Sequence, residues 1–163
     1  MSTKPPEKFT LDHVMVGQVT RIVNDIRIPR PFSINGLIER LNRQRDKPIR
    51  LMRGNLNSAM PTGMVVRTAT ADYIVVIRDI LRGHARHIHF HELGHLLLED
   101  AGVAGRCSSA EDPEHREIDE AIAEEFAHQL AERVDANVVT DQLPQAALNG
   151  TFAAARDLRG VRA

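Results

Sequence analysis

The chain has 163 residues, enough to bury one sizeable core and too few for two ordinary domains. With 42% hydrophobic and 26% charged residues, its composition excludes the disordered, collagen-like and membrane-spanning classes. The 21 basic and 22 acidic residues give a formal charge of only −1, so no overall field draws the chain onto nucleic acid or an anionic membrane.

The N-terminal residues and the cysteine content indicate the cellular compartment. The first residues are not followed by the apolar run of a signal peptide, and no stretch approaches the roughly 18 apolar residues of a membrane span. Cys107 is the only cysteine, so neither an intramolecular disulfide nor a Cys-rich zinc site can form. We therefore expect a cytoplasmic protein that does not enter a membrane.

The chain divides into a tail, one domain and an extension. We expect residues 1–9 to form a flexible tail and residues 10–139 to form a single domain. Proline and glycine breaks set off residues 140–163 as a C-terminal extension, with a short helix near residues 152–158.

Two helices are expected in the first third of the chain. Residues 11–26 form a helix or a mixed segment, which the prolines that follow bring to an end. Ser33 is a plausible N-cap for the second helix. The apolar residues behind this cap have the spacing of one helical face: Leu37, Ile38 and Leu41.

Three short runs rich in Val, Ile and Met come next, at residues 49–53, 63–68 and 73–78. Turn-forming residues separate the runs, as is typical of strands. We expect them to form a small, mostly antiparallel three-stranded sheet.

Two long helices are expected after the sheet. The pattern is helical from Gly83 to about Glu99, where glycines end it. Asp112 and Pro113 have the order of an N-cap and a first helical residue, and an apolar stripe follows as far as Val134. The expected fold class is therefore α+β, with the sheet packed against these two helices.

The first long helix contains the segment His91-Glu92-Leu93-Gly94-His95. His91 and His95 are four residues apart, so both imidazoles project from one helical face and can bind one Zn²⁺. Glu92 is placed to take a proton from a zinc-bound water, whose pKa the ion lowers to about 7. Such a string also arises by chance, but here it lies on a helix that follows a sheet, with an acid-rich helix downstream. We therefore predict a zinc site with Glu92 as general base.

A catalytic zinc site requires a third protein ligand. The second long helix offers Glu117, Glu120, Glu124 and Glu125. At about 100° per residue, Glu120 lies among alanines at the border of the apolar stripe, where it can point at a neighbouring helix. We predict Glu120 as the third ligand and keep Glu117 and Glu124 as reserves.

Other side chains near the motif have possible roles. His87 lies one turn before His91, so a ligand pair shifted by one turn is an alternative, although it would lose Glu92 as a well-placed base. Asp119 is a candidate for orienting a ligand histidine, whereas Cys107 is expected to be inert. The candidates for stabilising an oxyanion are Tyr73, His84, His89, His115 and His128.

The motif and the helix after it resemble the ImmA/IrrE family of small metallo-endopeptidases, which are minigluzincin-like HExxH proteins. That family has a His-Glu-Leu-Gly-His-Leu-Leu-Leu type segment followed by a helix with a Glu, an Ala and a Phe-Ala pair. Residues 91–98 match the segment, and the match extends over roughly residues 33–130. The helix matches in order and spacing at Glu120, Ala123, Phe126 and Ala127.

The resemblance implies a zincin-like fold with Glu120 as the third zinc ligand beside His91 and His95. The chain departs from the family at Glu124, where Asn is frequent. It departs again at residues 129–132, where the family usually has Leu-Leu-Met-Pro. Because of these departures, the resemblance does not define the edge of the site that would contact the substrate.

The resemblance also implies a partner, because family members cleave or antagonise repressor-type transcription factors. We therefore predict a zinc-dependent endopeptidase whose protein substrate or partner is a DNA-binding repressor. The alternative is a zinc-stabilised toxin or binding partner in a toxin-antitoxin-like module, which would act by sequestration rather than proteolysis.

A third alternative is direct nucleic-acid binding through a stretch rich in basic residues. Solvated surface arginines are the simpler interpretation of this stretch. It comprises Arg27, Arg30, Arg40, Arg43, Arg45, Lys47, Arg50 and Arg53.

Overall fold

The computed structural model describes residues 11–55, 61–104 and 113–142. This part of the chain has an α+β fold with four helices and a three-stranded mixed sheet. The expected tail, Cys107, the Asp112 cap and the short helix near residues 152–158 lie outside the described residues. None of the described helices combines the length and apolar character needed to cross a membrane.

The first two helices begin at side-chain caps. Helix α1 (His13–Asp25) follows Asp12, whose Oδ1 accepts a hydrogen bond of 2.8 Å from the Met15 amide. Helix α2 (Ile34–Asn42) follows Ser33, whose Oγ accepts one of 3.0 Å from the Gly36 amide. Such caps satisfy amide groups that have no partner within the helix. The Ser33 cap and the helix over residues 11–26 are confirmed.

The sheet contains β1 (Ile49–Gly54), β2 (Gly63–Arg67) and β3 (Asp72–Ile77) in the order β1-β3-β2. β2 and β3 are antiparallel, as the short connection between them allows. β1 and β3 are parallel, with Ile49 opposite Asp72 and Gly54 opposite Ile77. The expectation of a mostly antiparallel sheet is wrong for this pair. β2 lies between β1 and β3 in the sequence but at the far edge of the sheet. The chain then reverses direction after β2, so β3 lies in the centre of the sheet and runs in the same direction as β1.

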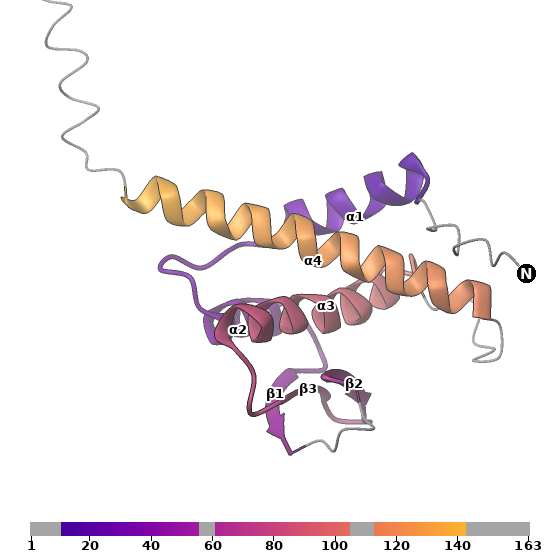
Figure 1. Cartoon of the computed structure of the whole chain (residues 1–163), viewed down its shortest axis with the longest axis horizontal. Helices are drawn as coiled ribbons and strands as arrows, with labels where there is room; N and C mark the ends of the chain where they lie inside the picture. The colour runs from indigo at the N-terminus through magenta and orange to yellow at the C-terminus, as the bar shows by residue number, and fades with distance from the viewer. Residues whose placement is uncertain (1–10, 56–60, 105–112, 143–163) are drawn as a thin grey trace, which may run out of the picture.

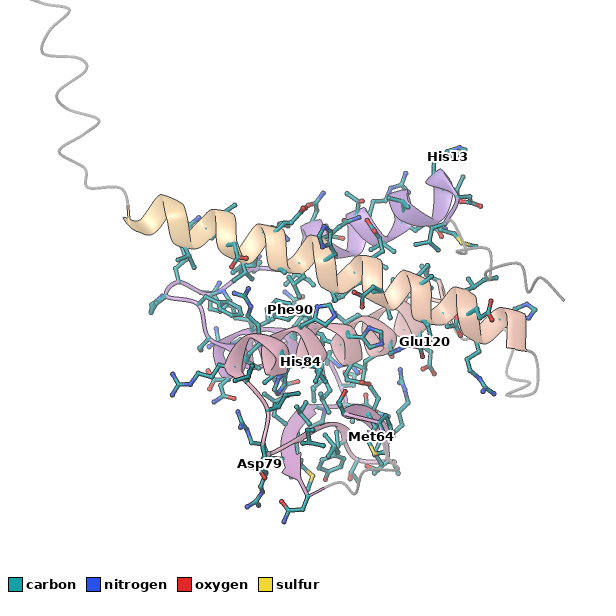
Figure 2. The ribbon with its side chains drawn as sticks, in the orientation of Figure 1. His13, Met64, Asp79, His84, Phe90 and Glu120 are labelled. Carbon is teal, nitrogen blue, oxygen red and sulfur yellow. The ribbon has the colours of Figure 1, made fainter. Side chains whose placement is uncertain are left out.

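The long helices are α3 (Arg82–Asp100) and α4 (Pro113–Gln142), and α3 lies between α4 and the sheet (Figure 1). α4 runs back along α3 and continues past residue 139, where the domain was expected to end. Phe90 is buried and lies in the layer between the two helices (Figure 2). The core combines side chains of both helices with inward-facing side chains of the sheet, among them Leu93, Leu96, Ile122, Phe126, Ile74 and Val76.

Gly94 allows α3 and α4 to approach closely. A Cβ atom at Gly94 would lie 3.0 Å from Phe126 Cδ1 and 3.2 Å from the Ala123 carbonyl oxygen. Both distances are shorter than ordinary van der Waals contact, so a larger residue would push the helices apart. This close crossing lies one residue before His95 and holds that part of α3 against α4.

A charged cluster joins the sheet to the C-terminal end of α3. Asp72 is 0% exposed at the start of β3, and its Oδ2 accepts a hydrogen bond of 2.8 Å from Arg45 Nη2. Lys47 Nζ forms an ion pair with Asp72 Oδ1 at 2.6 Å. Arg45 and Arg67 both pair with Asp100 of α3. These contacts fix one end of α3 relative to β2 and β3.

Candidate metal centre

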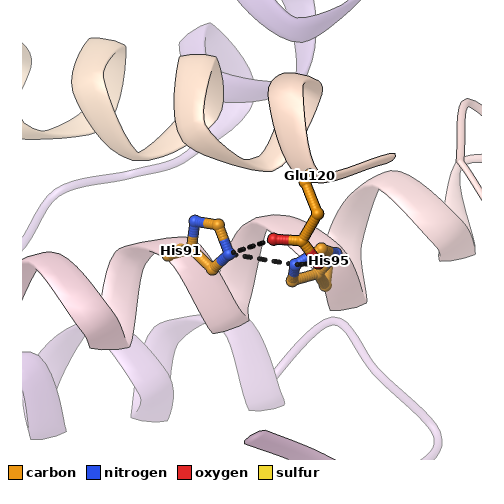
Figure 3. A group of neighbouring side chains, drawn as sticks. All are labelled: His91, His95 and Glu120. Atoms are coloured by element: carbon orange, nitrogen blue, oxygen red, sulfur yellow. Dashed lines mark hydrogen bonds and ion pairs between the residues drawn. The ribbon is translucent and has the colours of Figure 1, made fainter. Parts of the chain in front are cut away.

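His91 and His95 lie one turn apart on α3, and their Nε2 atoms are 3.0 Å apart. Glu120 reaches them from α4, with Oε2 3.3 Å from His91 Nε2 and Oε1 3.5 Å from His95 Nε2 (Figure 3). One ligand atom from each of the three residues lies within 4.8 Å of the others, which makes them a group able to hold a metal ion. The structure thus brings together the three residues that the sequence singles out.

The spacing of these atoms can be compared with that around a tetrahedral metal ion. Ligand atoms at 2.0 to 2.1 Å from zinc at tetrahedral angles are about 3.3 Å from one another. The two imidazole nitrogens are 3.0 Å apart, and one Glu120 oxygen lies 3.3 Å from His91 Nε2 while the other lies 3.5 Å from His95 Nε2. Two imidazoles and a carboxylate are also donors that zinc accepts readily. The group could therefore hold a metal ion, and three ligands from the described residues would leave a fourth position open.

Glu92 lies beside the group and is only 9% exposed. Burial raises the pKa of its carboxyl to about 7; the negative charge of Glu120 adds to this rise and the charge of His91 opposes it. A buried carboxyl with a raised pKa beside a group able to hold a metal ion is a feature that functional sites often share.

Gly63, at the start of β2, packs directly on this part of α3. A Cβ atom at Gly63 would lie 2.3 Å from Ile88 Cγ2 and 2.7 Å from Glu92 Oε1. Only a glycine lets the strand approach the helix so closely, and this approach covers the Glu92 side chain. The role of Gly63 could not be predicted from the sequence, because no local pattern shows that a strand residue meets a helix residue further along the chain.

The pKa of His95 is lowered, mainly by burial and further by the charge of His91. The negative charges of Glu120 and Asp119 oppose this lowering. A neutral imidazole is the form that binds a metal ion. Asp119 thus acts on His95 through its charge, while its predicted role in orienting that histidine remains a prediction.

Glu124 contacts the outer side of the group. Its Oε2 lies 3.3 Å from His91 Nδ1 and 3.1 Å from His87 Nε2. It therefore stands behind His91 as a hydrogen-bond acceptor for the nitrogen that faces away from Glu120. Glu124 is a reserve candidate for the third metal ligand, but it lies outside the three-residue group and contacts His91 and His87 instead. A hint of this contact is present in the sequence, since Glu124 is one turn from Glu120 and His87 is one turn from His91.

An open cleft of about 560 Å³ lies over the group, between β2 and the two long helices. Beside the metal group, its lining includes Gly63 and Val65 of β2 and His84 and His87 of α3. A peptide in this cleft would reach both the metal group and Glu92.

The remaining predicted residues lie elsewhere. Tyr73 is not among the residues that line the cleft. His89 is buried, and its Nδ1 donates to the Ala85 carbonyl oxygen at 2.5 Å. Burial lowers the pKa of His89; the hydrogen bond to Ala85 opposes this and the charge of Arg53 adds to it. His128 pairs with Glu132 at 3.3 Å. Among the histidines proposed for an oxyanion, only His84 lines the cleft.

Comparison of the chain with models of known protein families, with curated proteins and with solved structures finds no match in any of the three.

Proposed function

We propose that this chain is a zinc-dependent endopeptidase. The observation that carries the proposal is the meeting of His91, His95 and Glu120 at distances that suit zinc, with the buried Glu92 beside them in an open cleft. Structural zinc sites are closed by four protein ligands, whereas catalytic sites keep one position free. The three-residue group among the described residues is of the second kind.

Each residue of the group has a role in this proposal. Zinc, when bound, supplies Lewis acidity that polarises the peptide carbonyl and the attacking water. Glu92 accepts the proton of that water as its oxygen attacks the carbonyl carbon, and then passes the proton to the leaving amine nitrogen. His84 and His87 line the same cleft, so their imidazoles are candidates for stabilising the negative charge that develops on the carbonyl oxygen.

The free edge of β2 supports a peptide as substrate. In the order β1-β3-β2, no described strand pairs with the outer edge of β2. Gly63 and Val65 of this strand line the cleft. An extended peptide can add to such an edge through main-chain hydrogen bonds, which would bring its carbonyl groups past the metal group.

We propose a DNA-binding repressor as the substrate. This part of the proposal rests on the resemblance of residues 91–98 and 120–127 to the ImmA/IrrE metallo-endopeptidases. The cleft is open, so it admits an extended segment of a protein rather than only a small molecule.

The test is to measure zinc content and cleavage of a candidate repressor for the purified chain and three variants. We expect about one zinc ion per wild-type chain. Glu92→Gln should retain zinc and lose cleavage by about 10²- to 10⁴-fold. Glu120→Ala should lose both. Glu117→Gln, an exposed change on the same helix outside the group, is the matched control and should change neither.

Two outcomes would contradict the proposal. If the wild-type chain takes up no zinc, the metal centre is wrong. If Glu92→Gln behaves as wild type in the host while Glu120→Ala loses function, the zinc is structural and the chain acts by sequestering its partner.

A further inference from the structure

A second cleft, of about 600 Å³, lies between the start of α2, the end of β1 and the first turns of α3. Three arginines and one histidine are among its lining residues, and none of the residues that line it is acidic. The lining consists of Ser33, Ile34, Asn35, Leu51, Met52, Arg53, Arg82, Ala85, Arg86 and His89.

This cleft is separate from the metal centre. Successive residues of a helix are about 100° apart, so His89 points to the side of α3 opposite to His91. Ala85 and Arg82 share the side of His89, one turn and two turns earlier respectively. No residue that lines this cleft also lines the cleft over the metal group. The two sides of α3 thus border two different clefts.

The positive charges at this cleft are only partly neutralised. Arg86 forms a double ion pair with Asp135 of α4, at 2.9 and 3.3 Å. Arg53 and Arg82 are exposed, and neither forms an ion pair with any described residue. Two free guanidinium groups beside a concave surface attract an anion, because the cleft concentrates their field.

His89 gives the cleft a polar group in its wall. Its side chain is only 8% exposed, and Nδ1 donates to the Ala85 carbonyl, so the other ring nitrogen, Nε2, is the one left for a ligand. Among the described residues, Nε2 has no hydrogen-bond partner. A ligand that fits here therefore carries an anionic group for the arginines and a hydroxyl or amino group for His89.

We propose that this cleft binds a small molecule that carries a phosphate group, such as a nucleotide. Guanidinium groups recognise phosphate oxygens through paired hydrogen bonds, and three of them line this cleft. Ile34, Leu51 and Met52 form an apolar wall for the rest of the molecule, and Met52 is 50% exposed. The volume is that of an ordinary small-molecule site.

A nucleic-acid strand fits less well than a small phosphate ligand, because the basic residues do not form one continuous surface. Arg45 and Lys47 are paired with Asp72. Three other arginines line a third cleft, of about 400 Å³, together with Asp25: Arg27, Arg40 and Arg43. Sequence-independent binding to a strand needs a basic track along which many phosphates are contacted at once.

The test is calorimetric titration of the full chain with pyrophosphate and with ATP. Both should bind, and Arg53→Gln and Arg82→Gln should each weaken binding about tenfold or more, because each removes a charge-assisted hydrogen bond. Arg50→Gln is the matched control: it lies on the same strand as Arg53, is exposed and does not line the cleft. This control should bind like wild type, and so should Glu92→Gln, because the cleft does not depend on the proposed peptidase activity.

Three results would overturn the proposal. The first is no binding of pyrophosphate or ATP by the wild-type chain. The second is equal weakening by Arg50→Gln and Arg53→Gln, which would indicate a diffuse charge effect. The third is binding of duplex DNA or of a poly-glutamate peptide without binding of either small phosphate, which would make the cleft part of a macromolecular interface.

Discussion

Glu124 contacts two histidines of α3: His91, which belongs to the metal group, and His87, which does not. Its carboxylate accepts from the outer nitrogen of His91, whose other nitrogen faces Glu120. A carboxylate in this position fixes the tautomer and the ring orientation of a ligand histidine, and it increases the basicity of the metal-binding nitrogen. Glu124 is therefore a positioning residue for the proposed site.

Replacement of Glu124 by Gln should weaken zinc binding by about 10- to 100-fold without removing any ligand. Competition with a zinc chelator of known affinity measures this change. Glu117→Gln serves as the control, since it removes an exposed charge from the same helix but no described contact with His91. Equal affinities of wild type and Glu124→Gln would show that His91 needs no support from Glu124.

Gly63 is the residue of the sheet that touches the proposed base. We expect Gly63→Ala to destabilise the protein by about 1–3 kcal/mol, because the new methyl group would overlap Ile88 and Glu92. It should also reduce peptide cleavage, since β2 or Glu92 must move. Gly17→Ala is the control: nothing lies within 4 Å of its added Cβ, and alanine should stabilise α1 by about 0.5–1 kcal/mol. Chemical denaturation of the two variants should give changes of opposite sign.

The metal group belongs to a pair of helices rather than to the sheet. His91 and His95 come from α3 and Glu120 from α4, so a bound ion would tie the two helices together at the place where Gly94 already brings them close. Metal binding to the folded state alone adds to its stability.

Removal of zinc should therefore lower the melting temperature. With free zinc at about a thousand times the dissociation constant, binding contributes about 4 kcal/mol. Calorimetry with and without a chelator measures the difference. Glu120→Ala should melt at the same temperature in both conditions, and a chelator effect that persists in this variant would place the ion elsewhere.

Elements with strong local signals could be predicted, and contacts between distant elements could not. The Ser33 cap and the span of α3 depend on nearby residues, and the side of α4 on which Glu120 lies follows from helical geometry alone. The direction of β1 relative to β3 depends on how the chain returns after β2, which short apolar runs do not encode. The contact of Gly63 with Glu92 required the completed packing of strand on helix.

The Asp72 cluster connects parts of the molecule that are far apart in the chain. Arg45 precedes β1, Asp72 begins β3 and Asp100 ends α3. One group of charges therefore joins the sheet to the C-terminal end of α3, whereas the second cleft lies at its N-terminal end. A buried charge is tolerated when it is paired, and removal of one partner leaves the others uncompensated.

Asp72→Asn should lower the free energy of unfolding by about 3–5 kcal/mol, because Arg45 and Lys47 lose their buried partner. Urea denaturation monitored by circular dichroism measures this loss. Asp46→Asn, an exposed change between Arg45 and Lys47, should alter stability by less than about 0.5 kcal/mol. Similar stabilities of the two variants would mean that the cluster does not hold the sheet to α3.

The outer edge of β2, with which no described strand pairs, has a consequence for the behaviour of the protein in concentrated solution. Unpaired backbone groups at a sheet edge accept any extended chain, including the same strand of a second molecule. β2 is only five residues long, which limits how many hydrogen bonds a second copy can form there. The backbone groups proposed to receive a substrate are therefore also groups to which a second copy of the chain could pair, so substrate capture and self-association draw on the same strand.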